Sequence, residues 1–309
     1  MAALPLEALV RKPYDFMLVP KTPDDVRKKV VDYYSATTEQ SLLPNWGGES
    51  LGFHFGLGDE TTASLAESIA NTNSYLAERA NVSAGTRVLD AGCGVGGSAI
   101  WLARERGAQV VGLTLLESQV ALARRLATER GLDALLRFEV GDMAETGLPA
   151  GSFDVVWNIE SMCHVADLDG YLAHVGELLV DGGRFACIDL CAGPNPDAAV
   201  SRRVCEGWAM AALRDPAEIG AALERLGFEA VEVVDLTPRA LVSARALEAM
   251  ASRSLLKLRA EQAFLAQAGD PHYEGHVRAA VAMATGMRSG ATRLGHVLAR
   301  RARRAAPIS

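Results

Sequence analysis

Short apolar runs alternate with helical patterns along the middle of the chain, from about residue 85 to residue 237. The runs that read as strands lie at residues 86–90, 109–115, 136–140, 153–158, 183–190 and 230–236. Amphipathic stretches separate them, for example at residues 118–130, 168–180 and 216–226. Strands that alternate with helices of this length predict a mostly parallel sheet with helices on both faces. Such sheets bind ligands beyond the carboxyl ends of the strands, where the strand order reverses.

The two ends of the chain differ from this alternating core. The first 80 residues are rich in aromatic side chains, and residues 238–289 form an Ala-rich helical block. Residues 292–300 could return to the sheet as a last strand. We therefore expect a helical cap or lid at residues 1–80, an α/β core at 81–237, and a helical insertion with the final strand at 238–309. The completed sheet would have seven strands.

Composition narrows the range of partners. The net charge of −7 argues against binding a nucleic acid backbone, because that task needs a basic face. No apolar run is long enough for a membrane span, and the first residues lack the basic head and apolar block of a secretory signal. The five cysteines form no CxxC pair and the six histidines show no HExxH spacing. We therefore expect a cytoplasmic protein without disulfides or a metal site.

A glycine-rich loop follows the first strand of the core. The strand ends at Asp90 and runs through AGCGVGGS into a helix. Glycines there let the backbone turn tightly and let a ligand approach main-chain amides at the start of a helix. Gly92, Gly94 and Gly97 also satisfy the dinucleotide pattern GxGxxG. A nicotinamide oxidoreductase, however, would need an acid at the end of the second strand to hold the ribose. That strand end reads VGLTL.

Asp90 suits a ligand with a cationic amino acid end, so the loop favours S-adenosyl-L-methionine over a dinucleotide. The stretch VLDAGCGVGGSA resembles motif I of the class I S-adenosylmethionine-dependent methyltransferases. VGLTL followed by Gln119, VGDM at residues 140–143, and the upstream YY, WGG and FHFG segments are similar to one small-molecule branch. That branch includes sterol, tocopherol and prenyl diphosphate methyltransferases and cyclopropane fatty acid synthase-like enzymes.

The resemblance implies a Rossmann-like class I methyltransferase fold and a set of cofactor contacts. Thr114 and Gln119 would bind the ribose, and Asp142 and Met143 the adenine. The implied cofactor-binding residues are Asp90, Gly92, Gly94, Gly96, Thr114, Leu115, Gln119, Gly141, Asp142, Met143 and Asn158. Gly96 could instead serve only helix–strand packing, and Asp142 could be a turn or cap residue. A non-catalytic binding module would be expected to lose Asp90 or the glycines, and both are intact.

The fourth strand ends in polar residues, in the stretch FDVVWNIESMCHVADL at 153–168. This stretch resembles the acceptor-facing segments of sterol and prenyl diphosphate C-methyltransferases, and also those of O- and N-methyltransferases that use a His. Methylation of carbon makes a carbocation, which aromatic faces stabilise and a carboxylate deprotonates; Glu160 fits that role. Methylation of oxygen or nitrogen often needs a base, and His164 with Asp189 would fit that case.

We therefore expect an enzyme that methylates a small, largely apolar metabolite, in bacterial specialised metabolism. Carbon methylation of an isoprenoid, a sterol-like molecule or an electron-rich ring such as indole is favoured. The alternative is O- or N-methylation of a natural product with His164 as the base. The residues expected around the acceptor are Tyr34, Trp46, Phe53, His54, Trp157 and Trp208. Core packing is the alternative for the aromatics among the first 55 residues. For Glu160 the alternative is a structural hydrogen bond to the lid or to the amino group of the cofactor, and for His164 it is a polar start for the next helix. The lid and the insertion could also pair subunits in a homodimer.

Overall fold

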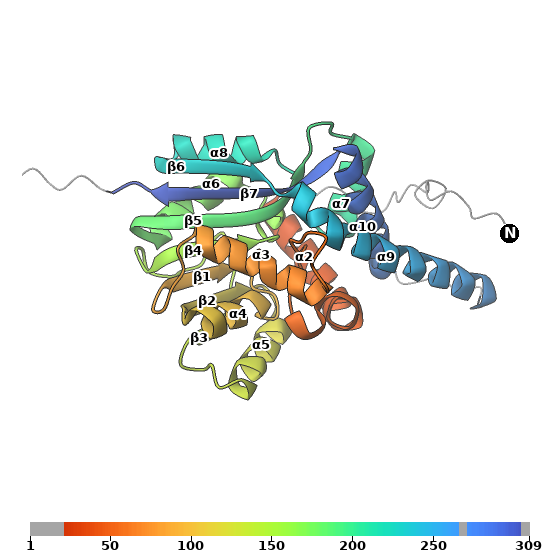
Figure 1. The fold of residues 1–309 in the computed structure, drawn as a ribbon, viewed down its shortest axis with the longest axis horizontal. Coiled ribbons are helices and arrows are strands. Elements are labelled where there is room, and N and C mark those ends of the chain that lie inside the picture. Colours follow the sequence, from red (N-terminus) through yellow and green to blue (C-terminus); the bar gives the residue numbers. More distant parts are fainter. Residues whose placement is uncertain (1–21, 266–270, 304–309) are drawn as a thin grey trace, which may run out of the picture.

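The computed structural model describes residues 22–265 and 271–303, arranged around one seven-stranded sheet (Figure 1). The strand order is β3-β2-β1-β4-β5-β7-β6, parallel throughout except that β7 runs antiparallel to β5 and β6. All the predicted strands are confirmed. Their bounds are β1 Arg87–Ala91, β2 Gln109–Thr114, β3 Leu136–Val140, β4 Phe153–Ile159, β5 Leu179–Ala192, β6 Phe228–Asp235 and β7 Thr292–Arg301.

Helices cover both faces of the sheet, which explains why its central strands are continuous apolar runs. On one face α3 (Leu65–Arg79), α4 (Gly97–Arg106) and α5 (Glu117–Glu129) bury Leu76, Leu102 and Val120 in the larger core cluster. On the other face α6 (Leu168–Leu178) and α8 (Pro216–Arg225) bury Leu172 and Leu223 in a second cluster. The edge strand β6 is mostly exposed or half-buried, and only Phe228 in it is buried.

The chain before α3 folds over the carboxyl ends of the strands, and we call residues 22–58 the lid. Helix α2 (Pro23–Thr37) begins with a capping box, in which Thr22 and Asp25 bond to each other's backbone N–H groups. A wide helical segment, η1 (Thr38–Gly47), and a short turn, η2 (Gly48–Ser50), follow it. Residues 1–21 of the expected cap, with the predictions made for the start of the chain, lie outside the described residues.

Two long helices separate β6 from β7, as the predicted insertion requires. They are α9 (Thr237–Leu265) and α10 (Pro271–Ser289), and α9 projects beyond the sheet (Figure 1). Helix α7 (Ala198–Gly207) packs against α10 at a glycine. A Cβ atom added at Gly207 would lie 2.3 Å from the carbonyl oxygen of Gly275 and 2.7 Å from the Cβ of Ala279. Only glycine therefore allows the two helices to approach this closely.

Three properties of the described residues, 22–265 and 271–303, concern membranes, metal ions and thiols. None of their helices is long and apolar enough to cross a membrane. They contain no group of three or more His, Cys, Asp and Glu side chains that could hold a metal ion. All five cysteines are free thiols, and four of them are buried.

The glycine contact between α7 and α10 gives a stability prediction. Gly207→Ala should lower the free energy of unfolding by about 1–3 kcal/mol, because the added methyl group must push the two helices apart. Gly275→Ala is the matched control, since its Cβ would meet only the Cα of Gly207, at 3.8 Å. This control should be neutral or raise stability by up to about 1 kcal/mol, the usual gain of Ala over Gly in a helix. Chemical denaturation measures both, and equal effects would contradict the prediction.

Candidate active site

The carboxyl ends of β1, β2 and β4 meet where the strand order reverses, between β1 and β4. A cavity of about 370 Å³ opens there, between these strand ends and α2 of the lid. We call it the strand-end cavity. The predicted cofactor residues on its wall are Asp90, Gly92, Gly94, Thr114, Leu115, Gln119, Gly141, Asp142 and Met143. The size falls within the range of sites for small ligands, about 300–1,000 Å³.

The glycine loop forms one wall of this cavity. Gly92 and Gly94 have φ values of 90° and 55°, a region that favours glycine. A Cβ at Gly94 would approach only the ring of Phe53, at 3.6 Å, so the loop leaves room beside it. Gly96, with a φ of 86°, does not line the cavity. A Cβ there would lie 2.8 Å from the ring of Phe138, so its position is explained by helix–strand packing, the alternative that the sequence left open.

Asp90 is the charged group at the end of β1. Its side chain is 3% exposed, and its Oδ2 atom has no hydrogen-bond partner within the described part of the chain. Burial raises the pKa of this carboxyl to about 7. An ionised, desolvated oxygen without a partner is costly, and a cationic ligand would compensate it. The ammonium group of S-adenosylmethionine therefore fits this position. It would lie beside the glycine loop, whose backbone a ligand can approach.

Thr114 and Gln119, the residues predicted to bind the ribose, lie together on the cavity wall. Thr114 Oγ1 donates a hydrogen bond to Gln119 Oε1 at 2.6 Å, and Gln119 Nε2 donates to Thr38 Oγ1 of the lid at 3.0 Å. Both side chains are buried, at the carboxyl end of β2 and the start of α5. Polar side chains thus stand where an acid would hold the ribose of a dinucleotide.

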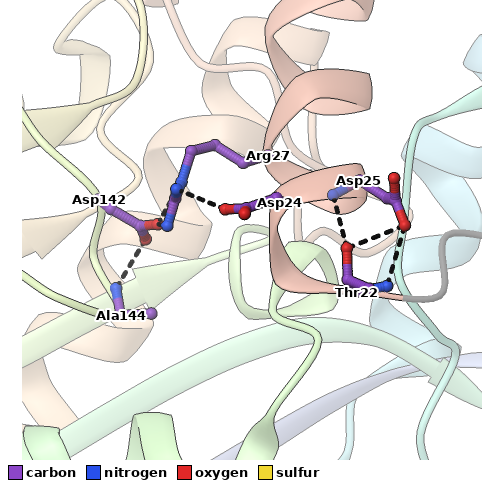
Figure 2. Close-up of polar contacts among 6 residues, drawn as sticks. All are labelled: Thr22, Asp24, Asp25, Arg27, Asp142 and Ala144. Atoms are coloured by element: carbon purple, nitrogen blue, oxygen red, sulfur yellow. Dashed lines mark hydrogen bonds and ion pairs between the residues drawn. The ribbon is translucent and has the colours of Figure 1, made fainter.

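Asp142 binds an arginine that the sequence analysis did not single out (Figure 2). Arg27 of α2 reaches Asp142 Oδ2 with Nε at 2.9 Å and Nη2 at 2.8 Å, while its Nη1 pairs with Asp24 at 2.9 Å. Asp142 Oδ1 accepts a hydrogen bond from the N–H of Ala144 at 2.9 Å. The ion pair connects the lid to the loop after β3. The hydrogen bond to Ala144 makes Asp142 a turn residue as well, which is the alternative raised by the sequence.

Asn158 lies behind the cavity wall rather than on it. Its Nδ2 donates to the carbonyl of Ala91 at 2.9 Å and to Ser161 Oγ at 2.8 Å. Its Oδ1 accepts from the hydroxyl of Tyr171 at 2.6 Å. The side chain is completely buried, so it holds β4 to the glycine loop and cannot contact a ligand directly. Ser161 and Tyr171 do line the cavity, although nothing in their sequence context marked them.

Glu160 joins the sheet to the lid. Its φ of 49° is rare for a residue with a side chain, and its N–H donates to the carbonyl of Ile188 at 2.8 Å. Its Oε1 accepts a hydrogen bond from the N–H of Phe55 at 2.6 Å, the lid contact considered from the sequence. Its Oε2 has no partner within the described residues. Burial, aided by the nearby negative charge of Asp189, raises the pKa of Glu160 well above its usual value.

A second, smaller cavity of about 60 Å³ adjoins the first, and we call it the aromatic cavity. The walls of both cavities include Tyr34, Phe53, His54, Glu160 and His164. The aromatic cavity is also lined by Tyr33, Trp46, Phe55, Trp208 and His276. All the residues predicted around the acceptor therefore reach it except Trp157. That indole is fully buried in the core, because β4 directs it under the covering helices.

The two histidines on the shared wall are neutral at physiological pH, because burial lowers the pKa of each to about 4. His164 Nδ1 lies 3.0 Å from the carbonyl of Ala209 and so carries the proton. Its Nε2 then accepts from the hydroxyl of Tyr34, at 3.2 Å. His54 likewise donates from Nδ1 to the carbonyl of Phe55 at 3.0 Å, and its buried Nε2 has no partner among the described residues.

Asp189 does not reach either cavity. Its oxygens accept hydrogen bonds from the N–H groups of Cys163 at 2.9 Å and Leu190 at 2.7 Å. Burial raises its pKa to about 6. The carboxyl thus supports the turn η3 (Met162–His164), which carries His164, rather than facing a ligand. Successive side chains of β5 point to opposite faces of the sheet, and both faces are buried here. The sequence therefore could not show which face borders the cavity.

The role of the buried Asp90 Oδ2 in ligand binding can be tested by Asp90→Asn. We expect affinity for S-adenosylhomocysteine to fall about 10- to 100-fold, because a charge-assisted hydrogen bond contributes about 1.5–3 kcal/mol. Isothermal titration calorimetry measures the change. Asp133→Asn, an exposed change away from the cavity, is the control. Equal affinity in the Asp90 variant and the wild type would contradict the assignment.

Asp90→Asn should also change how the stability of the folded chain depends on pH. Because the pKa of Asp90 is raised to about 7 in the folded chain, its contribution to stability is fully present below the unfolded pKa and is lost as pH rises through about 7. Without ligand, the melting temperature of the wild type should therefore fall between about pH 4 and pH 7 more than that of Asp90→Asn. Scanning calorimetry measures this, and an identical fall in both proteins would contradict it.

Comparisons with known proteins agree with this geometry. Residues 89–187 match the family described as "Methyltransferase domain". The chain is 33% identical over 218 residues to methyltransferase GfsG of Streptomyces halstedii, covering 69% of this chain and 77% of that protein. It is 32% identical over 250 residues to the 27-O-demethylrifamycin SV methyltransferase of Amycolatopsis mediterranei, covering 78% and 88%.

A solved structure of similar fold is the geranyl diphosphate C-methyltransferase of Streptomyces coelicolor A3(2). It superposes with a TM-score of 0.72 at 22% identity, covering 92% of this chain and 100% of that one. At that identity the likeness concerns the fold, while the two relatives above show the family. The sequence expectation for fold, cofactor and enzyme class is therefore confirmed. The chain belongs to the class I S-adenosylmethionine-dependent methyltransferases, in the small-molecule branch that its motifs resemble.

Proposed function

We propose that this methyltransferase transfers the methyl group to a carbon atom of a small, largely apolar acceptor held in the aromatic cavity. The observation that carries the proposal is Glu160, which lies on the wall shared by the two cavities. Within the described residues its carboxyl is bonded only through Oε1, to the N–H of Phe55, so Oε2 is available to an acceptor. The cofactor supplies a methyl group on a positively charged sulfur, and becomes neutral when the methyl group leaves. The positive charge then resides on the acceptor.

The aromatic cavity suits an acceptor that becomes cationic. The rings of Tyr34, Phe53, Phe55, Trp46 and Trp208 all lie on its wall. Ring faces carry partial negative charge and attract a cation by about 0.5–2 kcal/mol, more when water is excluded. Among the described residues, no Lys or Arg side chain lines this cavity. The walls therefore favour a positively charged intermediate over an anionic one.

Glu160 is placed to complete the reaction by removing a proton. When an alkene or an electron-rich ring carbon takes the methyl group, a C–C bond forms and the carbocation must lose a proton. The Oε2 atom of ionised Glu160 would accept it, while Phe55 N–H holds Oε1 in place. The raised pKa of Glu160 makes its carboxylate a stronger base than an exposed one, closer to the pKa that general bases need.

A second candidate is methylation of oxygen or nitrogen. It is supported by the pair of Tyr34 and His164, because His164 Nε2 carries a lone pair at the shared wall. The name of one relative, the 27-O-demethylrifamycin SV methyltransferase, points in the same direction. The origin of both relatives in Streptomyces and Amycolatopsis supports a role in bacterial specialised metabolism. A cytoplasmic location and a homodimer stay predictions.

The two candidates are separated by Glu160→Gln and His164→Gln. A panel of prenyl diphosphates, indoles, sterols and phenols would be incubated with cofactor carrying a carbon-13 methyl group, and NMR would show whether carbon, oxygen or nitrogen is labelled. We expect label on carbon and a fall in turnover of about 100-fold or more for Glu160→Gln, with a smaller effect for His164→Gln. Affinity for S-adenosylhomocysteine, the control, should not change in either variant.

The pH profile gives an independent readout. Turnover needs Glu160 ionised, so it should rise with pH through an apparent pKa well above the ordinary value of a Glu side chain. Glu160→Gln should lack this rise. His164, whose pKa is about 4, stays neutral and should add no step above that pH. Label on oxygen or nitrogen, with the larger loss in His164→Gln, would contradict the carbon proposal and support the second candidate.

A further inference from the structure

A third cavity, of about 170 Å³, lies where α9 packs on α10, and we call it the hairpin cavity. Its apolar walls include Met250 and Ala251 of α9 and Val277 and Ala280 of α10. Arg253 and Ser254 also lie on its wall. None of the residues predicted to bind the cofactor lines it. Most of its wall comes from the helical insertion, and Trp46 of the lid completes it.

The three cavities adjoin one another in series. The strand-end and aromatic cavities share five wall residues, as described above. The aromatic and hairpin cavities share Trp46, Leu247 and His276. His276 is held between them, because its Nδ1 lies 2.7 Å from the hydroxyl of Tyr33 and its carbonyl accepts from Trp208 Nε1 at 3.1 Å. A ligand whose reacting end lies beside Glu160 would therefore extend past His276 toward α9.

The charges around the hairpin cavity are unequal. Glu248 and Glu274, the acidic residues of α9 and α10 whose side chains are described, are paired with Arg288 and Arg278. Arg253 is exposed and forms no ion pair or hydrogen bond within the described residues. A guanidinium group at the wall of an apolar cavity is suited to a carboxylate or phosphate group.

We propose that the hairpin cavity binds the distal end of the acceptor, and that the acceptor is an elongated apolar molecule with an anionic group that reaches Arg253. This inference rests on the proposed function, which places the reacting end in the aromatic cavity. The aromatic cavity, of about 60 Å³, is much smaller than the strand-end and hairpin cavities. Only a slender part of the molecule passes there, so a chain or a flat ring fits and a bulky globular body does not.

The probes for the test are linear carboxylates, octanoate and dodecanoate, with the matched alcohols octanol and dodecanol. Each is titrated calorimetrically into the full chain saturated with S-adenosylhomocysteine. Dodecanoate should bind more than about tenfold more tightly than octanoate, because each buried methylene contributes about 0.8 kcal/mol. Arg253→Glu should weaken dodecanoate about tenfold or more and leave dodecanol unchanged. Arg245→Glu, another exposed arginine of α9 that does not line the cavity, is the matched control.

A second pair of variants tests the path rather than the charge. Ser254→Trp places a ring in the hairpin cavity from a half-buried position and should weaken both dodecanoate and dodecanol about tenfold or more. Ser252→Trp, two residues away and not on the wall, should leave the binding of both unchanged. The inference is overturned if the two tryptophan variants behave alike, if chain length has no effect, or if Arg253→Glu weakens acid and alcohol equally. In any of these cases the methyltransferase assignment still stands if the wild type binds S-adenosylhomocysteine. If the wild type does not bind S-adenosylhomocysteine, that assignment is overturned instead.

Discussion

Three carboxyl groups at the carboxyl ends of the central strands constrain the whole site. Asp90 and Asp189 are buried in β1 and β5, and the half-buried Glu160 follows β4. Desolvation raises the pKa of each. Backbone N–H groups satisfy both oxygens of Asp189 and one oxygen of Glu160. Asp90 Oδ2 has no partner in the described chain. The unsatisfied oxygens therefore face the cavities, where a cationic cofactor and an acceptor that becomes cationic would compensate them.

The lid forms an ion pair and hydrogen bonds with residues at the carboxyl ends of the strands, and the motifs predict these residues for the site. Arg27 pairs with Asp142, Thr38 bonds Gln119, and the N–H of Phe55 bonds Glu160. A Cβ at Gly97 would lie 2.5 Å from the carbonyl oxygen of Leu51, so the lid also touches the start of α4 directly. Closure of the lid and the arrangement of the cofactor site therefore depend on the same side chains.

Much of this arrangement could be predicted from the sequence, because its signals are local. The period of the apolar residues indicates the strands, and the glycines with Asp90 indicate the cofactor loop. The direction of a single side chain is not local. Gly96, Asn158, Trp157 and Asp189 lie next to the site in sequence, yet the backbone directs each of them into packing or support.

The residues that the sequence analysis missed come from distant segments. Arg27 is one basic residue in an ordinary amphipathic helix, and only the fold brings it to Asp142, 115 positions away. His276 lies in the insertion, whose sequence has no motif, and reaches Tyr33 across 243 positions. Such contacts follow from how α2, α7 and α10 pack around the strand ends. The spacing of residues within one segment cannot predict them.

The position of the cofactor is tested most directly by a crystal structure of the chain with S-adenosylhomocysteine. We expect the amino group within hydrogen-bond distance of Asp90 Oδ2 and the sulfur atom directed at the wall that Glu160 shares with the aromatic cavity. A cofactor whose amino group lies away from Asp90, or whose sulfur is directed away from the aromatic cavity, would contradict this expectation.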